Sequence, residues 1–349
     1  MIEEFGGGGD ILFERRGRAG VVTLTRGGAL NAVTHAMVLS LQRALDAWKA
    51  DDSVALVVIK AEGRAFSAGG DIVDIYKAGK AGRPPVAFFA DEYRLNAAIR
   101  CYPKPYVALI DGIAMGGGVG ISYHGSHRVV TENAVFAMPE CGIGFFPDVG
   151  GSFILPRLKG AYGMYIGLTG VRVGSGDQCW SGLATHMMES SALPSLFDEL
   201  CEADDIGKLL KARSRPRERE THEARIHAIN KHFSLGSLAD VVRSLQADEA
   251  ADSFARETLG LLREKSPTSM LVAFDQIAAG AALDIDECMR MEFRILNRML
   301  AGTDFYEGIR AAVIHKDRRP AWSPPTLGEV SETDVSAYFA PLPDGELDL

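Results

Sequence analysis

Apolar residues near the start of the chain follow two different periodicities. Residues 11–25 hold two β-rich runs, Ile11–Phe13 and Val21–Thr25, with Gly20 between them. These runs predict strands. The next apolar residues recur at helical spacing, as Met37, Val38, Leu41, Ala44, Leu45 and Trp48. With Thr34 in an N-cap position before them, they predict an amphipathic helix.

Continuous apolar runs come next, and each suits a strand that is covered on both faces. They are Val54–Ile59 and Tyr106–Ile110. Each leads on to a glycine-rich turn, Ala68-Gly69-Gly70 and Met115-Gly116-Gly117-Gly118 respectively. A helix is predicted to begin near Asp71. The remaining elements predicted here are a helix over 86–100, ended by Pro103 and Pro105, and short strands at 128–130 and 134–137.

The second half of the chain has a different pattern. A loop over 138–148 precedes helical patterns at 149–168, and strand signals fade from about residue 195. Residues 203–225 are densely charged, which predicts a solvated helical face with a loop at Pro216. An apolar stripe at 285–300 predicts a core helix. We therefore expect an α/β domain over 1–195 and a helical region over 196–349.

Composition and charge narrow the class of protein. The chain has 349 residues and a net charge of −9, with no basic patch that would indicate nucleic-acid binding. Its five cysteines form no C-x-x-C pair, which favours reduced thiols. The start, Met1–Phe5, is acidic and lacks an apolar segment, and Val54–Ile59 is far too short to span a membrane. These features predict a soluble, cytoplasmic protein that does not bind membranes.

Several familiar catalytic motifs are missing from the sequence. It contains no P-loop, no complete G-x-G-x-x-G, no G-x-S-x-G and no H-E-x-x-H. His124 and His127 lie three residues apart, but no third ligand is suggested nearby, so no metal site is predicted.

The two glycine turns are the first candidate for chemistry. In both, a buried strand ends, glycines follow, and a helix begins. Helix N-termini leave N–H groups unpaired, and glycine lets a ligand approach the backbone. Two N–H groups that converge from different turns would form an oxyanion hole. The alternative is that the glycines only allow close packing of helix on strand.

The loop at 138–148 is the second candidate, because it carries Glu140 and Asp148 among apolar and glycine residues. Pro139 and Pro147 stiffen the backbone beside them. Carboxylates in apolar surroundings have raised pKa values and suit acid–base catalysis. The alternative is that both are acids on a surface loop.

At these residues the chain resembles the crotonase (enoyl-CoA hydratase/isomerase) superfamily, and within it a branch of acyl-CoA hydrolases. The resemblance covers nearly the whole chain. The matching stretches are residues 64–72, 104–110, 115–120, 136–140, 146–151, 266–269, 304–310, 316–317 and 320–322.

The resemblance implies a spiral core of repeated β-β-α units followed by a helical C-terminal region. It implies a CoA thioester substrate, with CoA as part of that substrate and no separate cofactor. Gly70 and Gly117 would supply the oxyanion-hole amides, and Glu140 and Asp148 the catalytic carboxylates. Glu92 matches a substrate-contacting glutamate, with an exposed helix charge as the alternative. Members of the superfamily often form trimers or pairs of trimers, so a homo-oligomer is possible.

The sequence departs from the superfamily pattern at one position, and this position distinguishes hydration from hydrolysis. Enoyl-CoA hydratases use two glutamates, and the position of the first is Gly120 here. This departure favours hydrolysis over hydration, and the resemblance implies that the substrate is a short 3-hydroxyacyl-CoA, 3-hydroxyisobutyryl-CoA in particular, in a step of valine breakdown. An enoyl-CoA hydratase or isomerase is the first alternative. A non-catalytic CoA-binding scaffold is the second.

Overall fold

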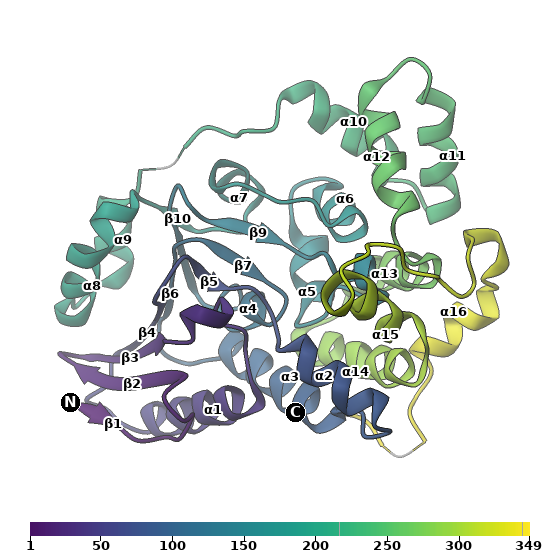
Figure 1. Cartoon of the computed structure of the whole chain (residues 1–349). Coiled ribbons are helices and arrows are strands. Elements are labelled where there is room, and N and C mark those ends of the chain that lie inside the picture. Colours follow the sequence, from purple (N-terminus) through teal and green to yellow (C-terminus); the bar gives the residue numbers. More distant parts are fainter. Residues whose placement is uncertain (216, 344) are drawn as a thin grey trace. The chain divides into compact units, whose positions relative to one another are not determined.

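The computed structural model describes residues 1–215, 217–343 and 345–349 (Figure 1). The chain divides into two compact units. The first unit comprises Met1–Asp71, Asp91–Phe136 and Val173–Glu220, and the second comprises Ile72–Ala90, Ala137–Arg172 and Thr221–Leu349. Each unit thus consists of three segments that alternate along the chain. The single domain boundary expected at residue 195 stays a prediction. The loop predicted at Pro216 lies outside the described residues.

Two β-sheets organise the first unit. Their strands are β1 (Ile2–Glu3), β2 (Ile11–Arg16), β3 (Ala19–Leu24), β4 (Leu56–Ala61), β5 (Ala65–Ser67), β6 (Tyr106–Ile110), β7 (Ile113–Met115), β8 (His127–Val130), β9 (Val135–Ala137) and β10 (His186–Met187). Within the described ranges, one sheet has the order β1-β2-β3-β4-β6-β8-β10 and the other β5-β7-β9. Pairing is antiparallel from β1 to β3 and parallel from β3 to β10.

The path of the chain through these sheets is repetitive. The large sheet gains the parallel strands β4, β6 and β8. After each of them the chain forms a strand of the small sheet, namely β5, β7 and β9. Parallel neighbours cannot be joined by a tight turn, so helical segments return the chain between them. This path is the predicted spiral of β-β-α units.

Most predicted elements of the first unit are confirmed. The helices of the first unit are α1 (His35–Lys49), α4 (Gly117–Gly120), α7 (Ser175–Ser181), α8 (Leu193–Glu202) and α9 (Ile206–Arg213), together with α3 (Val86–Arg100) from Asp91 onward. The Thr34 hydroxyl accepts a hydrogen bond from the Met37 N–H at 3.3 Å, as an N-cap does. Gly20 lies inside β3 rather than between strands. A Cβ there would lie 2.5 Å from the Trp48 ring, so only glycine fits.

The second unit is helical. Its helices are α2 (Ile72–Lys80), α5 (Gly151–Ile154), α6 (Tyr162–Thr169), α10 (Glu223–Phe233), α11 (Leu238–Asp248), α12 (Ser253–Arg263), α13 (Pro267–Gly280), α14 (Ile285–Ala301), α15 (Asp304–Ile309) and α16 (Glu332–Phe339). The predicted stripe at 285–300 is confirmed as the buried face of α14. The helical stretch predicted over 149–168 is broken into α5 and α6. Gly150 and Gly160 adopt positive φ angles of 84° and 59° there, which a helix does not allow.

Across the described part of the chain, no helix is both long enough and apolar enough to cross a membrane.

Candidate active site

Gly70 lies in the turn between β5 and α2. The Val33 N–H donates to the Gly69 carbonyl at 2.8 Å, and the Asp71 N–H donates to the Val33 carbonyl at 3.1 Å. This is an isolated parallel bridge between Val33 and Gly70. Because the bridge uses groups of the two neighbours of Gly70, the N–H of Gly70 itself points away from Val33. Gly69 has a φ of +116°, which favours glycine.

Gly117 is the first residue of α4, and its N-cap Gly116 has a φ of 46°. The first N–H groups of a helix have no acceptor within the helix. A Cβ on Gly117 would lie 3.4 Å from the Gly70 nitrogen, so the two turns approach each other closely at these residues. Close packing matters as well, because a Cβ on the next residue, Gly118, would collide with the Ser67 carbonyl.

Glu92 projects from α3 to the same place. Its Oε1 lies 2.6 Å from the position of a Cβ on Gly117. The side chain is 2% exposed, and the described residues give Oε1 no hydrogen-bond partner. Burial raises the pKa of Glu92 to about 8. An exposed helix charge is thereby excluded, and the first unit gathers Gly70, Gly117 and Glu92 in one spot.

Gly120 faces Asn96, a residue that the sequence analysis missed. A Cβ on Gly120 would lie 2.6 Å from Asn96 Nδ2, and Asn96 is fully buried. A glutamate at position 120 would have to displace that amide. Asn96 comes four residues after Glu92, so both lie on one face of α3, and this spacing was the available signal.

Glu140 belongs to the second unit, where it opens a 3₁₀ turn over Glu140–Ile143. It is 6% exposed, and the described residues leave its Oε2 without a hydrogen-bond partner. Burial raises the pKa of Glu140 to about 8, and the negative charge of Glu292 adds to the rise. A carboxylate in this state can act as base or nucleophile once it is ionised.

Asp148 lies further along the same loop and is 5% exposed. Its carbonyl accepts a hydrogen bond from the Gly151 N–H at 2.8 Å, which closes a turn before α5. The preceding carbonyl, of Pro147, accepts from Gln276 Nε2 on α13 at 2.5 Å. Both loop carboxylates are buried, so the alternative of surface acids is excluded.

Glu292 on α14 is a second residue that the sequence analysis missed. It is fully buried and accepts hydrogen bonds from the turn that follows Asp148. It comes three residues after Met289 and four before Leu296, so it lies on the apolar face of its helix. A charged residue on a predicted buried face was the signal that could have revealed it.

One group of three side chains among the described residues has the spacing of a metal site. His232, Asp248 and Asp252 place one ligand atom each within 4.8 Å of one another. However, Lys231 forms an ion pair with Asp248, and Asp252 caps α12 by accepting from the Phe254 N–H. Because both carboxylates already have partners, we assign no metal to this group.

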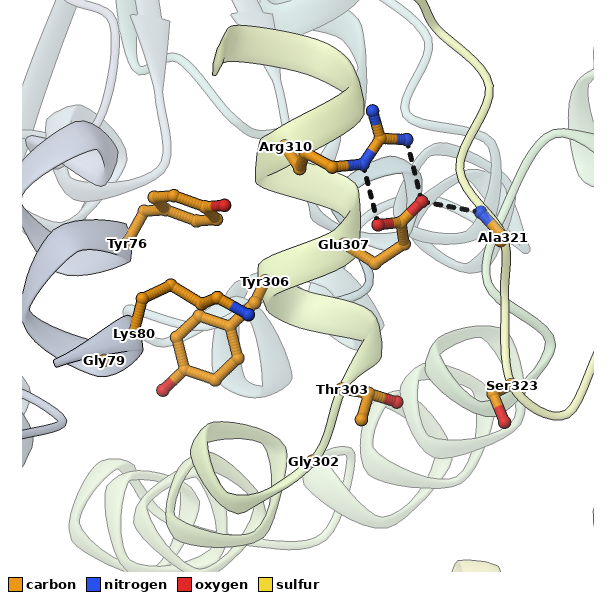
Figure 2. Close-up of a pocket in the computed structure, with 10 residues that line it drawn as sticks. All are labelled: Tyr76, Gly79, Lys80, Gly302, Thr303, Tyr306, Glu307, Arg310, Ala321 and Ser323. Carbon is orange, nitrogen blue, oxygen red and sulfur yellow. Dashed lines mark hydrogen bonds and ion pairs between the residues drawn. The ribbon is translucent and has the colours of Figure 1, made fainter. Parts of the chain in front are cut away.

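A pocket of about 580 Å³ lies between α2 and α15 in the second unit (Figure 2). Tyr76 and Lys80 line it from α2, and Tyr306 lines it from α15. Glu307 and Arg310 pair through two hydrogen bonds of 2.8 Å (Figure 2), and Arg310 also forms an ion pair with Asp317. Lys80 adds a positive charge to the lining of this pocket, which suits an anionic group.

The fold and the two sets of site residues identify the class of protein. The sequence profile of the enoyl-CoA hydratase/isomerase family matches residues 19–339, and the chain belongs to this family. The curated relatives to which it is similar include hydrolases. It is 43% identical to the 3-hydroxyisobutyryl-CoA hydrolase, mitochondrial, of Danio rerio, over 98% of this chain and 92% of the relative. Identity to the Homo sapiens protein of the same name is 40%, over 97% of this chain and 90% of the relative.

Solved structures confirm the crotonase-like fold. A carnitinyl-CoA dehydratase from Mycobacterium thermoresistibile has a TM-score of 0.91 and 38% identity, over 97% of this chain and 98% of that one. An enoyl-CoA hydratase from Rhodobacter sphaeroides 2.4.1 has a TM-score of 0.88 and 38% identity, over 97% of this chain and 100% of that one.

The comparisons also correct one prediction. The curated relatives are named as mitochondrial proteins, so the predicted cytoplasmic location is wrong. That prediction rested on reduced cysteines and on the absence of an apolar leader. Reduced cysteines separate reducing from oxidising compartments, and they do not separate the cytosol from the mitochondrial matrix.

Proposed function

We propose that this chain hydrolyses the thioester of a short 3-hydroxyacyl-CoA, 3-hydroxyisobutyryl-CoA in particular, to the free acid and CoA, as a step of valine breakdown. The relatives named for this reaction support it. Some solved relatives are named as a hydratase or a dehydratase, so membership of the family alone does not choose the reaction. The observation that carries the choice is Gly120, packed against the buried Asn96 where a hydratase has its first glutamate.

The neighbouring amides of Gly70 and Gly117 are proposed to bind the thioester oxygen. As a nucleophile attacks the carbonyl carbon, negative charge develops on that oxygen, and donors already in place stabilise it. Removal of one such donor typically costs about 2.7–4 kcal/mol of transition-state stabilisation.

Glu140 is proposed to act on the carbonyl carbon by one of two routes. In the first, its carboxylate takes a proton from water while the water oxygen attacks. In the second, the carboxylate itself attacks and forms a mixed anhydride, which water then cleaves. In both routes the C–S bond breaks, the sulfur leaves with the bonding electrons, and protonation gives the free thiol of CoA.

Asp148 and Glu92 are proposed to handle the rest of the acyl group. Asp148 would orient the substrate hydroxyl or the water, or carry a proton between them. Glu92 is proposed to contact the substrate beside the two amides. Its buried Oε1, which has no partner among the described residues, can accept a hydrogen bond from a hydroxyl.

The pocket between α2 and α15 is proposed to bind the phosphate-bearing part of CoA. Lys80 supplies the charge, and the rings of Tyr76 and Tyr306 supply flat apolar surfaces (Figure 2). Because Lys80 is exposed, its contact with phosphate is weak. We expect Lys80→Ala to raise KM roughly threefold to fivefold and to leave kcat unchanged.

The deciding experiment is thiol release from short 3-hydroxyacyl-CoA thioesters. We expect fastest release from 3-hydroxyisobutyryl-CoA. Hydration of crotonyl-CoA without any thiol release would instead assign the chain to the hydratases. Binding of CoA without either reaction would assign it to the scaffolds. A single turnover in ¹⁸O-labelled water separates the two routes, since hydrolysis of an anhydride can leave the label in the Glu140 carboxylate.

A further inference from the structure

The turn that follows Asp148 has a costly backbone conformation. Val149, a β-branched residue, has a φ of 49°, and Gly150 has a φ of 84°. The left-handed region is unfavourable for a β-branched side chain, because its Cβ approaches the backbone carbonyl. Such a conformation persists only where the surroundings hold it in place.

Glu292 on α14, which also belongs to the second unit, stabilises this turn through hydrogen bonds. Its Oε2 accepts from the Gly150 N–H at 2.9 Å. Its Oε1 accepts from the Ser152 N–H at 3.0 Å and from the Ser152 hydroxyl at 2.5 Å. Each oxygen of the carboxylate therefore accepts a hydrogen bond from a backbone amide, one on each side of Gly151.

The carboxylate itself is fully buried. A buried carboxylate is unfavourable unless hydrogen bonds satisfy it, and an apolar residue would fill the same space without that cost. The three donors all come from the turn that carries Asp148, and none comes from a cation. This set of three hydrogen bonds is the one expected of a residue whose role is to stabilise the turn.

We propose that Glu292 is a positioning residue, which holds the turn over residues 148–152 and thereby orients the Asp148 carboxylate. This inference rests on the proposed function. In this proposal Glu292 acts through its hydrogen bonds to the turn and not through contact with the substrate.

The charges around Glu292 predict a second consequence. Together with burial, the negative charge of Glu292 raises the pKa of Glu140 in the 3₁₀ turn and that of the Cys288 thiol in α14. The positive charge of Arg157 lowers the pKa of the same thiol. Burial raises the pKa of Glu292 to about 7, although its hydrogen bonds oppose the rise. Because the charge of Glu292 raises the pKa of Glu140, its removal should shift the pH profile of activity to lower pH.

The test compares Glu292→Gln with Ser152→Ala and with a control, Asp286→Asn, which makes the same change of carboxylate to amide on the same helix. For each variant, thiol release gives kcat and KM per folded enzyme, and hydrogen exchange reports on the Gly150 and Ser152 amides. We expect Glu292→Gln to lower kcat about 10²-fold, to change KM little, to speed exchange in the turn and to move the pH profile down. Asp286→Asn should match the wild type.

Ser152→Ala removes one of the three donors and keeps the backbone amides, so it remains informative if Glu292→Gln does not fold. We expect it to lower kcat roughly tenfold. An unchanged kcat in whichever of the two variants folds, or unchanged exchange in the turn, would overturn the proposal. If the wild type releases no thiol, the proposed function fails, while the exchange measurement still decides whether Glu292 holds the turn.

Discussion

The two units supply chemistry in different ways. In the first unit, the proposed oxyanion hole consists of backbone amides of Gly70 and Gly117, placed by strand ends and by glycines that allow close approach. In the second unit, the proposed reacting groups are the side chains of Glu140 and Asp148, and buried polar side chains of α13 and α14 hold their loop. Local sequence motifs position the backbone amides, whereas the position of the carboxylate side chains depends on partners far away in sequence.

This contrast predicts a large loss of activity when a backbone donor of the first unit is removed. Gly117→Pro removes the amide hydrogen at the start of α4, which is one of the two proposed donors. We expect hydrolysis to fall by about 10³-fold, measured as thiol release and accompanied by circular dichroism to verify folding.

Two glycine-to-alanine variants separate the donor from the space around it. Gly117→Ala keeps the N–H but places a Cβ beside the Glu92 carboxylate, so it should impair activity less than proline. Gly260→Ala adds a Cβ that meets no atom within 4 Å and serves as the control. Near-normal hydrolysis by folded Gly117→Pro would show that the Gly117 amide does not bind the thioester oxygen.

In the second unit, Glu140→Gln keeps the shape of the side chain and removes its charge. We expect a loss of roughly 10²–10⁴-fold in kcat, with CoA binding retained, as measured by thiol release and calorimetry. Asp148→Asn should lose less. Glu264→Gln, at an exposed position, is the matched control. If Glu140→Gln hydrolyses the substrate like the wild type, the loop is structural and the assignment of Glu140 is wrong.

The pH dependence of hydrolysis tests the same carboxylate without a mutation. Glu140 must be ionised to act as base or nucleophile, and its pKa in the folded protein is raised to about 8. We therefore expect kcat/KM to increase by about tenfold per pH unit below pH 8 and to level off above it. A profile that is already flat from pH 5 would contradict a raised pKa at the reacting group.

The smallest expected effect concerns stability and Glu92 in the first unit. Its pKa is raised from 4.5 to about 8 by burial, so between these values the unfolded chain loses a proton that the folded protein retains. The free energy of unfolding should therefore decrease as pH rises through this range. Glu92→Gln removes this contribution, and thermal unfolding at pH 5 and pH 8 should show a smaller difference in Tm than in the wild type. An identical difference would mean that Glu92 is not buried as described.

Particular elements show how far sequence reasoning reaches. The strand Tyr106–Ile110 and the helix Val86–Arg100 have the predicted bounds, because a continuous apolar run and a pair of flanking prolines are local signals. β5 and β7 were missed, since three-residue strands leave little pattern. The helical pattern over 149–168 started too early, because Gly150 is the left-handed N-cap of α5, where a partner outside the segment stabilises a non-helical backbone.

The sequence by itself determined the repeated path of strand, glycine turn and helix, the candidates Gly70, Gly117, Glu140 and Asp148, and the absence of a glutamate at position 120. These are properties of short segments, where residue type and spacing limit the backbone. Only the tertiary structure decided that Gly70 and Gly117 are neighbours, that Glu92, Glu140 and Asp148 are buried, and that Glu292 holds the turn after Asp148. Long-range hydrogen bonds join residues far apart in sequence, such as Gly150 and Glu292, which are 142 positions apart. No local pattern in the sequence encodes such distances.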